Sequence, residues 1–264
     1  MKQHLARQSI FRPIAVFFTA SAILFSGCAY FANKPLKTLS YVAGTPSPNR
    51  NLFIFLRGLG GSHHSFEKEG LVEATRQRGL DFDMAAPNAH FIYYLERTLL
   101  QRLRQDVILP AKGKGYENIW LVGFSMGGLG SLLYAHKHPE DIKGVCLISP
   151  FLGYDALIDE INKSGGLQNW TPGEYSPDDD WQRMLWHWIK TRVASQNAPP
   201  VYLGFGTGDP YAQAQQLLAT ALPAHRVIRL KGAHDYETFK KIWQRFLDRN
   251  VWRDNEKTRP AAPD

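Results

Sequence analysis

The sequence predicts an α/β architecture in which a mostly parallel sheet is covered by helices on both faces. Apolar runs of strand length alternate with segments of helical periodicity, which is the pattern of α/β proteins. The strand runs are continuously apolar, as in strands buried on both faces. The chain has 264 residues, 44% of them hydrophobic, which is enough for one domain with a full core and too few for two large domains.

The predicted strands and helices follow one another along the chain. We expect a short strand at 38–42 and further strands at 52–56, 81–87, 118–124, 143–149, 201–206 and 225–230. Helical patterns cover about 63–78, 91–109, 125–138, 211–221 and 236–250. We predict that the second helix stops at Pro110, because proline lacks the amide hydrogen that a helix interior requires.

The segment 151–198 interrupts this alternation, because it is long, rich in tryptophan and acidic. We predict an insertion that forms a cap over one end of the sheet. Within it, Trp181, Leu185, Trp188 and Ile189 recur near helical spacing and indicate one amphipathic helix. This helix is either a lid whose apolar face covers a binding pocket or an element packed permanently on the core.

The N-terminus has the organisation of a signal peptide. Lys2, Arg7 and Arg12 form a basic region, and residues 13–27 follow without a charge. This run is short for a membrane span and has the proportions of a signal-peptide core. An uncleaved anchor helix is the alternative.

The end of this run resembles the lipobox of bacterial lipoproteins. Ser26 and Gly27 directly precede Cys28, although Phe25 stands where that motif more often has leucine. The resemblance implies cleavage before Cys28 and lipidation of its thiol. Ala29, rather than aspartate, follows the cysteine, which in that family implies an outer-membrane anchor facing the periplasm. A plain signal peptide remains the alternative.

Charge and cysteine content exclude other classes. The formal charge is +7, and removing residues 1–27 removes three basic groups and no acidic group, which leaves +4. No basic stripe interleaved with aromatic residues is present, so a nucleic-acid partner is not expected. Cys146 lies in an apolar run and would have no disulfide partner if Cys28 carries lipid; we expect it to be a buried free thiol.

The stretch LVGFSMGGLGS (121–131) places Ser125 between Gly123 and Gly127, where a predicted strand meets a predicted helix. A nucleophile on so tight a turn needs glycine two residues before and after it, because side chains there would collide with neighbouring backbone. The following helix offers its positive N-terminus to developing negative charge. The pattern predicts that Ser125 is a catalytic nucleophile.

A serine nucleophile needs a base and an acid, which this pattern supplies downstream. Asp209 follows the predicted strand 201–206, and His234 follows the strand 225–230. Both positions lie at the carboxyl ends of parallel strands, which is the edge where Ser125 is expected. We therefore predict a triad of Ser125, Asp209 and His234.

An oxyanion hole requires backbone amides that point at the carbonyl oxygen of the substrate. One is expected from Met126, directly after the nucleophile. The other is expected from Leu59, in the glycine-rich stretch FLRGLGGSHHSF that follows the strand 52–56. Arg57 opens this loop, and a cation there could attract an anionic substrate group.

These motifs together resemble the α/β-hydrolase superfamily over about residues 50–250, although Arg57 replaces the usual histidine of the H-G-x-G-G loop. The resemblance implies an eight-stranded sheet, or one trimmed at its first strands, with Ser125 as nucleophile, His234 as base and Asp209 as acid. It implies no metal or organic cofactor. We divide the chain into a signal peptide (1–27), a lipidated cysteine with tether and first strand (28–49), a hydrolase domain (50–252) with its cap, and a flexible tail (253–264).

Other residues offer competing interpretations. Asp235 could be the acid but is well placed to cap the last helix. Asp155 follows the strand 143–149, where some hydrolases carry their acid. His63 and His64 either line the pocket or begin a solvated helix.

His136 and His138 suggest a metal site, but their place at a helix C-terminus favours interaction with the helix dipole. We expect no metal.

The sequence thus predicts a serine hydrolase that cleaves carboxylic esters or thioesters through an acyl-enzyme, anchored in the bacterial envelope by lipid. Its expected partner is a small acyl substrate with an apolar group, because the insertion is rich in tryptophan. Two alternatives remain: an amidase or peptidase on the same fold, and a non-catalytic envelope binding protein. The fold alone does not choose among them.

Overall fold

The computed structural model describes residues 34–43 and 50–252. The predicted signal peptide, the lipidation site at Cys28, most of the tether and the tail 253–264 lie outside these residues. Among the described residues, no helix has the length and apolar character needed to cross a membrane.

In the described part of the chain, seven strands form one sheet in the order β1-β3-β2-β4-β5-β6-β7. All neighbouring pairs are parallel except β1 with β3. This is the predicted mostly parallel sheet, and over residues 34–43 and 50–252 it has the trimmed rather than the eight-stranded form. The strands are β1 (Thr38–Tyr41), β2 (Asn51–Leu56), β3 (Asp83–Pro87), β4 (Asn118–Phe124), β5 (Gly144–Ile148), β6 (Val201–Gly206) and β7 (Val227–Leu230).

The strand order changes direction at β2. The chain passes from β2 to β3 on one side and then returns to place β4 on the other side of β2. In open parallel sheets, ligands bind outside the carboxyl ends of the strands at such a switch point. The loop after β2 and the turn after β4 therefore meet where a ligand is expected.

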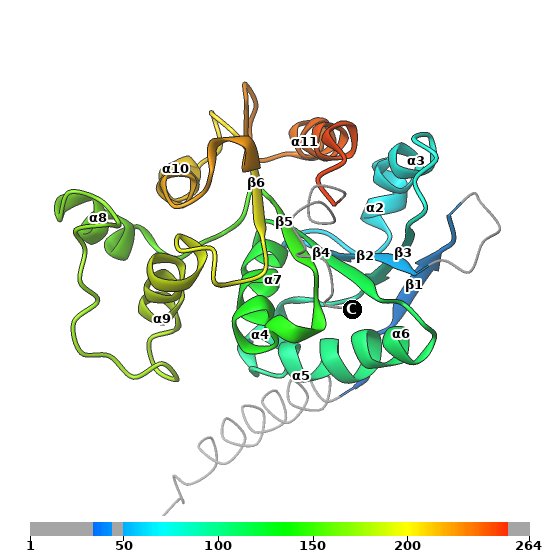
Figure 1. The fold of residues 1–264 in the computed structure, drawn as a ribbon, viewed down its shortest axis with the longest axis horizontal. Coiled ribbons are helices and arrows are strands. Elements are labelled where there is room, and N and C mark those ends of the chain that lie inside the picture. Colours follow the sequence, from blue (N-terminus) through cyan, green and yellow to red (C-terminus); the bar gives the residue numbers. More distant parts are fainter. Residues whose placement is uncertain (1–33, 44–49, 253–264) are drawn as a thin grey trace, which may run out of the picture.

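Helices cover both faces of the sheet, as Figure 1 shows for α2, α3 and α11 on one face and α5, α6 and α7 on the other. The first face carries α2 (Ser65–Lys68), α3 (Leu71–Arg76) and α11 (Tyr236–Arg249). The second carries α4 (Phe91–Leu95), α5 (Leu99–Leu103), the π-helix η1 (Arg104–Ile108), α6 (Leu109–Gly113), α7 (Met126–Lys137) and α10 (Ala212–Thr220).

Strand β4 shows how the two cores form. Ile119 and Leu121 point to the α7 side, whereas Trp120 and Val122 point to the α11 side, and all four are at most 1% exposed. Because side chains alternate along a strand, a continuously apolar run fills both layers at once. Cys146 of β5 lies in the α11-side core as a free thiol, and burial raises its pKa.

The predicted helix over 91–109 is broken in the structure, and its predicted end is wrong. Arg97 adopts a left-handed conformation with φ 54° between α4 and α5. The π-helical turn η1 then interrupts the α-helical hydrogen bonding before Pro110, which lies in the first turn of α6. A proline is tolerated there because its missing amide hydrogen would have no helical partner, so the helix continues to Gly113.

The insertion contains α8 (Asp155–Lys163), α9 (Trp181–Trp188) and the π-helix η3 (Ile189–Val193). The predicted helical face is buried at Leu185, Trp188 and Ile189, whereas Trp181 is half-buried. Trp186 is also fully buried, and its indole donates to the carbonyl oxygen of Leu152 at 2.9 Å. The apolar face of α9 is thus packed on the core in this structure.

Candidate active site

Ser125 sits in a strained turn between β4 and α7. Its φ of 52° and ψ of −117° lie outside the regions that non-glycine residues favour. A Cβ on Gly123 would collide with the carbonyl of Gly127, and a Cβ on Gly127 would collide with the carbonyl of Leu56. The flanking glycines are therefore required by backbone contacts, as the motif predicts.

The structure brings Ser125, His234 and Asp209 together from three different strand ends. Nε2 of His234 lies 2.9 Å from Oγ of Ser125, and Nδ1 lies 2.7 Å from Oδ2 of Asp209. The side chain of Asp209 is fully buried, whereas that of His234 is 23% exposed. Asp209 therefore orients the imidazole from the buried side, and part of the imidazole remains exposed to solvent.

Asp209 is held as a carboxylate by its neighbours. Its Oδ1 accepts a 2.8 Å hydrogen bond from the amide of Tyr211. Burial alone would raise the pKa of Asp209, but interactions with His234, the Tyr211 amide and Ser149 lower the pKa below its ordinary value. An ionised carboxylate at this point can fix the imidazole tautomer and stabilise an imidazolium.

Ser149, at the end of β5, is a neighbour of Asp209 that the sequence reasoning does not single out. It is fully buried and has φ 47°. Its Oγ makes no hydrogen bond of standard geometry but lies close enough to the carboxylate to lower its pKa. The position could have been found by extending the strand-end argument to β5, because β5 lies between β4 and β6.

The glycine-rich loop after β2 packs against the nucleophile. A Cβ on Gly58 would lie 3.1 Å from the Cβ of Ser125. Leu59 follows with a side chain that is 60% exposed, whereas Met126 is 7% exposed at the start of α7. Amides in the first turn of a helix have no helical acceptor, so the amide of Met126, at the start of α7, is free of α-helical pairing. The role of the Leu59 amide stays a prediction.

The competing acids have other places in the structure. Asp235 caps α11, because its Oδ1 accepts from the amide of Thr238 at 2.8 Å. Asp155 begins α8 and is exposed.

Of the histidines, His63 and His64 lie in the loop after β2 with ring centroids 4.3 Å apart. His63 is half-buried near Arg57, which contributes to lowering its pKa after the larger effect of burial.

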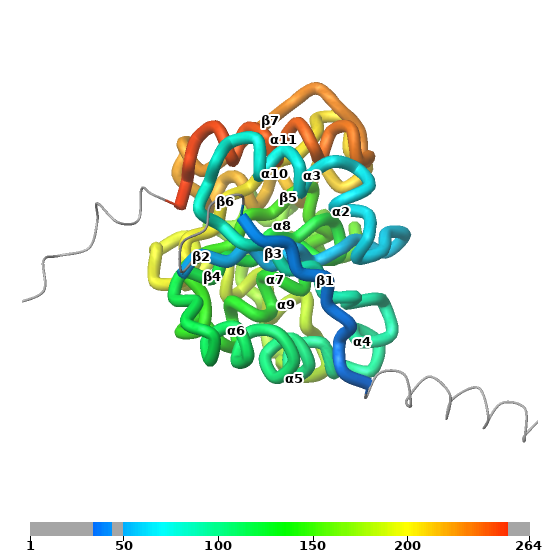
Figure 2. Tube along the Cα trace, turned by 90° about the vertical axis from the view of Figure 1, so that its right-hand side faces the viewer, coloured from blue at the N-terminus to red at the C-terminus, as the bar shows by residue number. Residues whose placement is uncertain are grey.

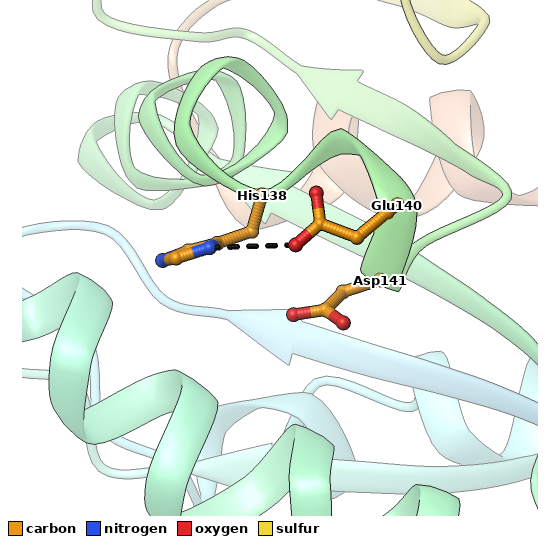
Figure 3. A group of neighbouring side chains, drawn as sticks. All are labelled: His138, Glu140 and Asp141. Carbon is orange, nitrogen blue, oxygen red and sulfur yellow. Dashed lines mark ion pairs between the residues drawn. The ribbon is translucent and has the colours of Figure 1, made fainter.

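The histidines at the end of α7 do not assemble a convincing metal centre. His136 stacks edge-on against Trp188 at 5.4 Å. His138 lies beside Glu140 and Asp141, as Figure 3 shows. One potential ligand atom of each residue lies within 4.8 Å of the others. Asp141, however, already accepts hydrogen bonds from Arg104 and Lys112, and two cations at that carboxylate oppose the binding of a third.

A protein-family model for esterases matches residues 61–254, which include all three residues of the candidate triad. The chain belongs to the esterase family. The predicted α/β-hydrolase relationship is thereby confirmed.

Solved structures with the same fold are also esterases and hydrolases. Est1E from Butyrivibrio proteoclasticus aligns with a TM-score of 0.55 and 18% identity over 84% of this chain and 95% of Est1E. The S-formylglutathione hydrolase FrmB of Staphylococcus aureus aligns with a TM-score of 0.54 and 14% identity over 82% and 96% of the two chains. These similarities confirm the predicted fold.

A curated relative is similar over a shorter stretch. Lipase 1 of Psychrobacter immobilis is 34% identical over 88 residues, which make up 33% of this chain and 27% of the lipase. The match thus spans about a quarter of the length of that relative.

In this member of the esterase family, a row of aromatic rings connects the insertion with the candidate triad. The ring of Trp181 lies 6.3 Å from that of Phe151, and Phe151 lies 5.4 Å from Tyr211. Tyr211 in turn packs edge-on against His234 at 5.2 Å. Tyr154, which is 65% exposed, extends the row at 5.5 Å from Phe151. These rings give the triad an apolar flank.

Proposed function

We propose that this chain hydrolyses carboxylic esters or thioesters through an acyl-enzyme formed on Ser125. The observation that supports this function best is the pair of hydrogen-bond distances that joins Ser125 to His234 and His234 to Asp209. The strained turn at Ser125 adds support, because it exposes the hydroxyl beside the N-terminus of α7.

Each residue has a defined role in the proposed reaction. His234 accepts the proton of Ser125 as its Oγ attacks the acyl carbonyl, and Asp209 stabilises the resulting imidazolium. The amides of Leu59 and Met126 donate to the oxyanion. His234 then protonates the leaving group, and an activated water molecule releases the acid and regenerates Ser125.

The aromatic row supports a substrate with an apolar group. Phe151, Tyr211 and Trp181 form a series of ring contacts from the insertion to His234, and such rings bind apolar or aromatic groups by area burial. A structure of Est1E holds ferulic acid, which is an aromatic acid. We therefore favour small esters with an apolar or aromatic part.

The test is hydrolysis of p-nitrophenyl esters of short and medium acids by the chain from Lys34 onward. We expect Ser125→Ala to lower kcat by at least about 1000-fold, because the residues of such a triad act as a unit. Ser195→Ala, at an exposed serine far along the insertion, should retain full activity. Labelling of the protein by a fluorophosphonate, lost only in Ser125→Ala, identifies the nucleophile directly.

The alternatives give different results in the same assay. An amidase or peptidase would cleave p-nitroanilides of the same acids at rates comparable to the esters. A non-catalytic binding protein would show neither turnover nor fluorophosphonate labelling, and this outcome would refute the proposed function.

We also propose that Cys28 is lipidated and holds the domain at the outer membrane, facing the periplasm. The support is the sequence pattern that ends at Gly27 and Cys28. Incorporation of labelled palmitate into the full chain should be lost in Cys28→Ala and retained in Cys146→Ala, since Cys146 is buried in β5. Labelling of both variants would exclude Cys28 as the lipidation site.

A further inference from the structure

Arg57 is a buried cation at the start of the loop that packs against Ser125. The residue is 8% exposed, and its Nε has no hydrogen-bond partner. Its Nη1 makes only two long hydrogen bonds, of 3.5 Å each, to the carbonyl oxygens of Gly58 and Leu59. Most of the donor capacity of the guanidinium is therefore unused.

No carboxylate balances this charge in the part of the chain that the structure describes. Several other arginines form ion pairs with Asp or Glu, as Arg104 and Arg183 do, but no ion pair of the described residues includes Arg57. Burial lowers the pKa of Arg57, and nearby Tyr94 and Tyr236 only partly oppose this effect. A guanidinium still stays protonated at neutral pH, and a buried charge without a partner is unfavourable.

The surroundings of Arg57 are polar and contain further atoms without partners. Nδ1 of His63 and the hydroxyl of Tyr94 are buried and form no hydrogen bond. Both side chains are close enough to Arg57 for its charge to contribute to their pKa values, after the larger effect of burial. The pKa of His90 is also lowered, first by burial and then by the charge of Arg57. Polar atoms without partners beside a buried guanidinium leave hydrogen-bonding capacity that a polar or anionic ligand group could use.

This group of residues is adjacent to the proposed reaction centre. Arg57 directly precedes Gly58, and a Cβ on Gly58 would lie only 3.1 Å from the Cβ of Ser125. A Cβ on Gly61 would lie 2.7 Å from the hydroxyl of Tyr236, two residues after His234. A substrate bound at Ser125 would therefore place groups a few bonds from its carbonyl near this loop.

We propose that Arg57 binds a carboxylate of the substrate, so that the preferred substrates are esters carrying a carboxylate a few bonds from the scissile carbonyl. The proposal rests on the proposed function and refines its substrate class. A guanidinium binds a carboxylate through paired N–H donors. The carboxylate of the substrate would supply the partner for Arg57 that no described Asp or Glu provides. The apolar row from Trp181 to Tyr211 accommodates the rest of the molecule.

The test compares matched charged and neutral esters. The first pair is mono-p-nitrophenyl glutarate and its methyl ester, with the carboxylate on the acyl side. The second pair is 4-acetoxybenzoate and its methyl ester, with the carboxylate on the leaving group. For each pair, the ratio of kcat/KM for the charged and the neutral ester is measured, after subtraction of the rate with Ser125→Ala.

We expect Arg57→Gln to lower this ratio at least about tenfold in one of the two pairs, as the loss of a charged hydrogen bond predicts. Arg57→Lys should restore part of the ratio. The matched control is Arg50→Gln, which removes the same charge at the opposite end of β2, from an arginine whose side chain is 66% exposed. Its ratio should equal that of the wild type.

Two results would overturn the proposal. One is an unchanged ratio in both pairs for folded Arg57→Gln, which would leave Arg57 only a role in holding the loop. The other is equal inhibition of the wild type by glutarate and by neutral glutaramide, a measurement that needs no variant. If the neutral and the charged esters are hydrolysed without preference, only the role of Arg57 is refuted and the proposed function stands. If the chain hydrolyses no ester and is not labelled at Ser125, the proposed function and the role of Arg57 are both refuted.

Discussion

Ser125 shows at the scale of one residue how the turn depends on its neighbours. Its positive φ is held by close contact of Gly123 and Gly127 with backbone atoms. The amide of Ser125 donates to the carbonyl of Ile148 at 3.0 Å, which ties the turn to β5. The strained conformation is thus maintained by two neighbouring strands rather than by local preference.

Gly127→Ala tests this dependence. The added Cβ would overlap the carbonyl of Leu56, so we expect destabilisation of about 1–3 kcal/mol or more together with loss of ester hydrolysis. Gly113→Ala is the control, because a Cβ there meets nothing within 4 Å at the end of α6. Thermal unfolding of both variants checks the prediction, and equal stability of the two would contradict it.

Ser149→Ala tests the environment of the triad acid. Because Ser149 helps to lower the pKa of Asp209, its removal should raise that pKa, so that the carboxylate protonates at a higher pH than in the wild type. Asp209 stays ionised near neutral pH in both proteins, so we expect kcat/KM to change less than about threefold there. The loss relative to the wild type should grow as the pH decreases toward the pKa of Asp209. A pH profile that keeps its wild-type shape would show that the Ser149 hydroxyl does not act on Asp209.

At the scale of elements, α7 is fixed at both ends by different chemistry. Its N-terminus emerges from the turn at Ser125. Its C-terminus leads into the 3₁₀ turn η2 (Pro139–Asp141), where Asp141 receives hydrogen bonds from Arg104 of η1, Lys112 of α6 and Tyr134 of α7. The carboxylate thus joins three elements that are separate in sequence.

Asp141→Asn measures the strength of this junction. Burial alone would raise the pKa of Asp141, but the hydrogen bonds from Lys112, Arg104 and Tyr134 lower it to about 2. A depressed carboxylate pKa stabilises the fold above the unfolded value near 4 and loses this effect as the pH falls toward 2. We expect the variant to be about 2 kcal/mol less stable at pH 7.

Denaturant unfolding at several pH values tests this expectation. The difference between wild type and Asp141→Asn should shrink progressively below about pH 4. A difference that stays constant down to pH 2 would show that packing, rather than the charge of Asp141, is responsible.

At the scale of the whole molecule, the N-terminal strand closes one edge of the sheet. The beginning of the described chain runs beside α4 before it enters β1, as Figure 2 shows, and the hydroxyl of Tyr93 donates to the carbonyl of Lys34 at 3.2 Å. The amide of Leu36 donates to Asp106 at 2.9 Å. Leu36 and Tyr41 are both buried.

Truncation tests the contribution of this edge. A chain that starts at Lys34 should retain the stability of the domain and its activity on soluble esters. A chain that starts at Arg50 removes β1, exposes the edge of β3 and loses the large buried side chains of Leu36 and Tyr41, each worth about 1.5–3 kcal/mol. We expect a lower Tm and aggregation by light scattering; two truncations of equal stability would contradict the prediction.

The sequence by itself determined the alternation of strands and helices and the strand ends that carry Ser125, Asp209 and His234. Apolar runs and glycine spacing are local patterns, and the boundaries of β4 and β6 agree with them. Local patterns also indicated Asp235 as a helix cap. They could not predict the break in the helix over 91–109, because the π-turn η1 and the bend at Arg97 depend on packing against the sheet.

Only the tertiary structure decided which acid faces His234, which groups surround that acid and which cation lacks a partner. The choice of Asp209 over Asp155 depends on where β5, β6 and β7 end relative to one another, and this follows from the register of their hydrogen bonds. The contact of Ser149 with Asp209, and the lack of an acidic partner for Arg57 among the described residues, also follow from how the strands and loops are placed relative to one another. A sequence shows the residue types along one chain, whereas distances between strands are set by the packing of all of them together.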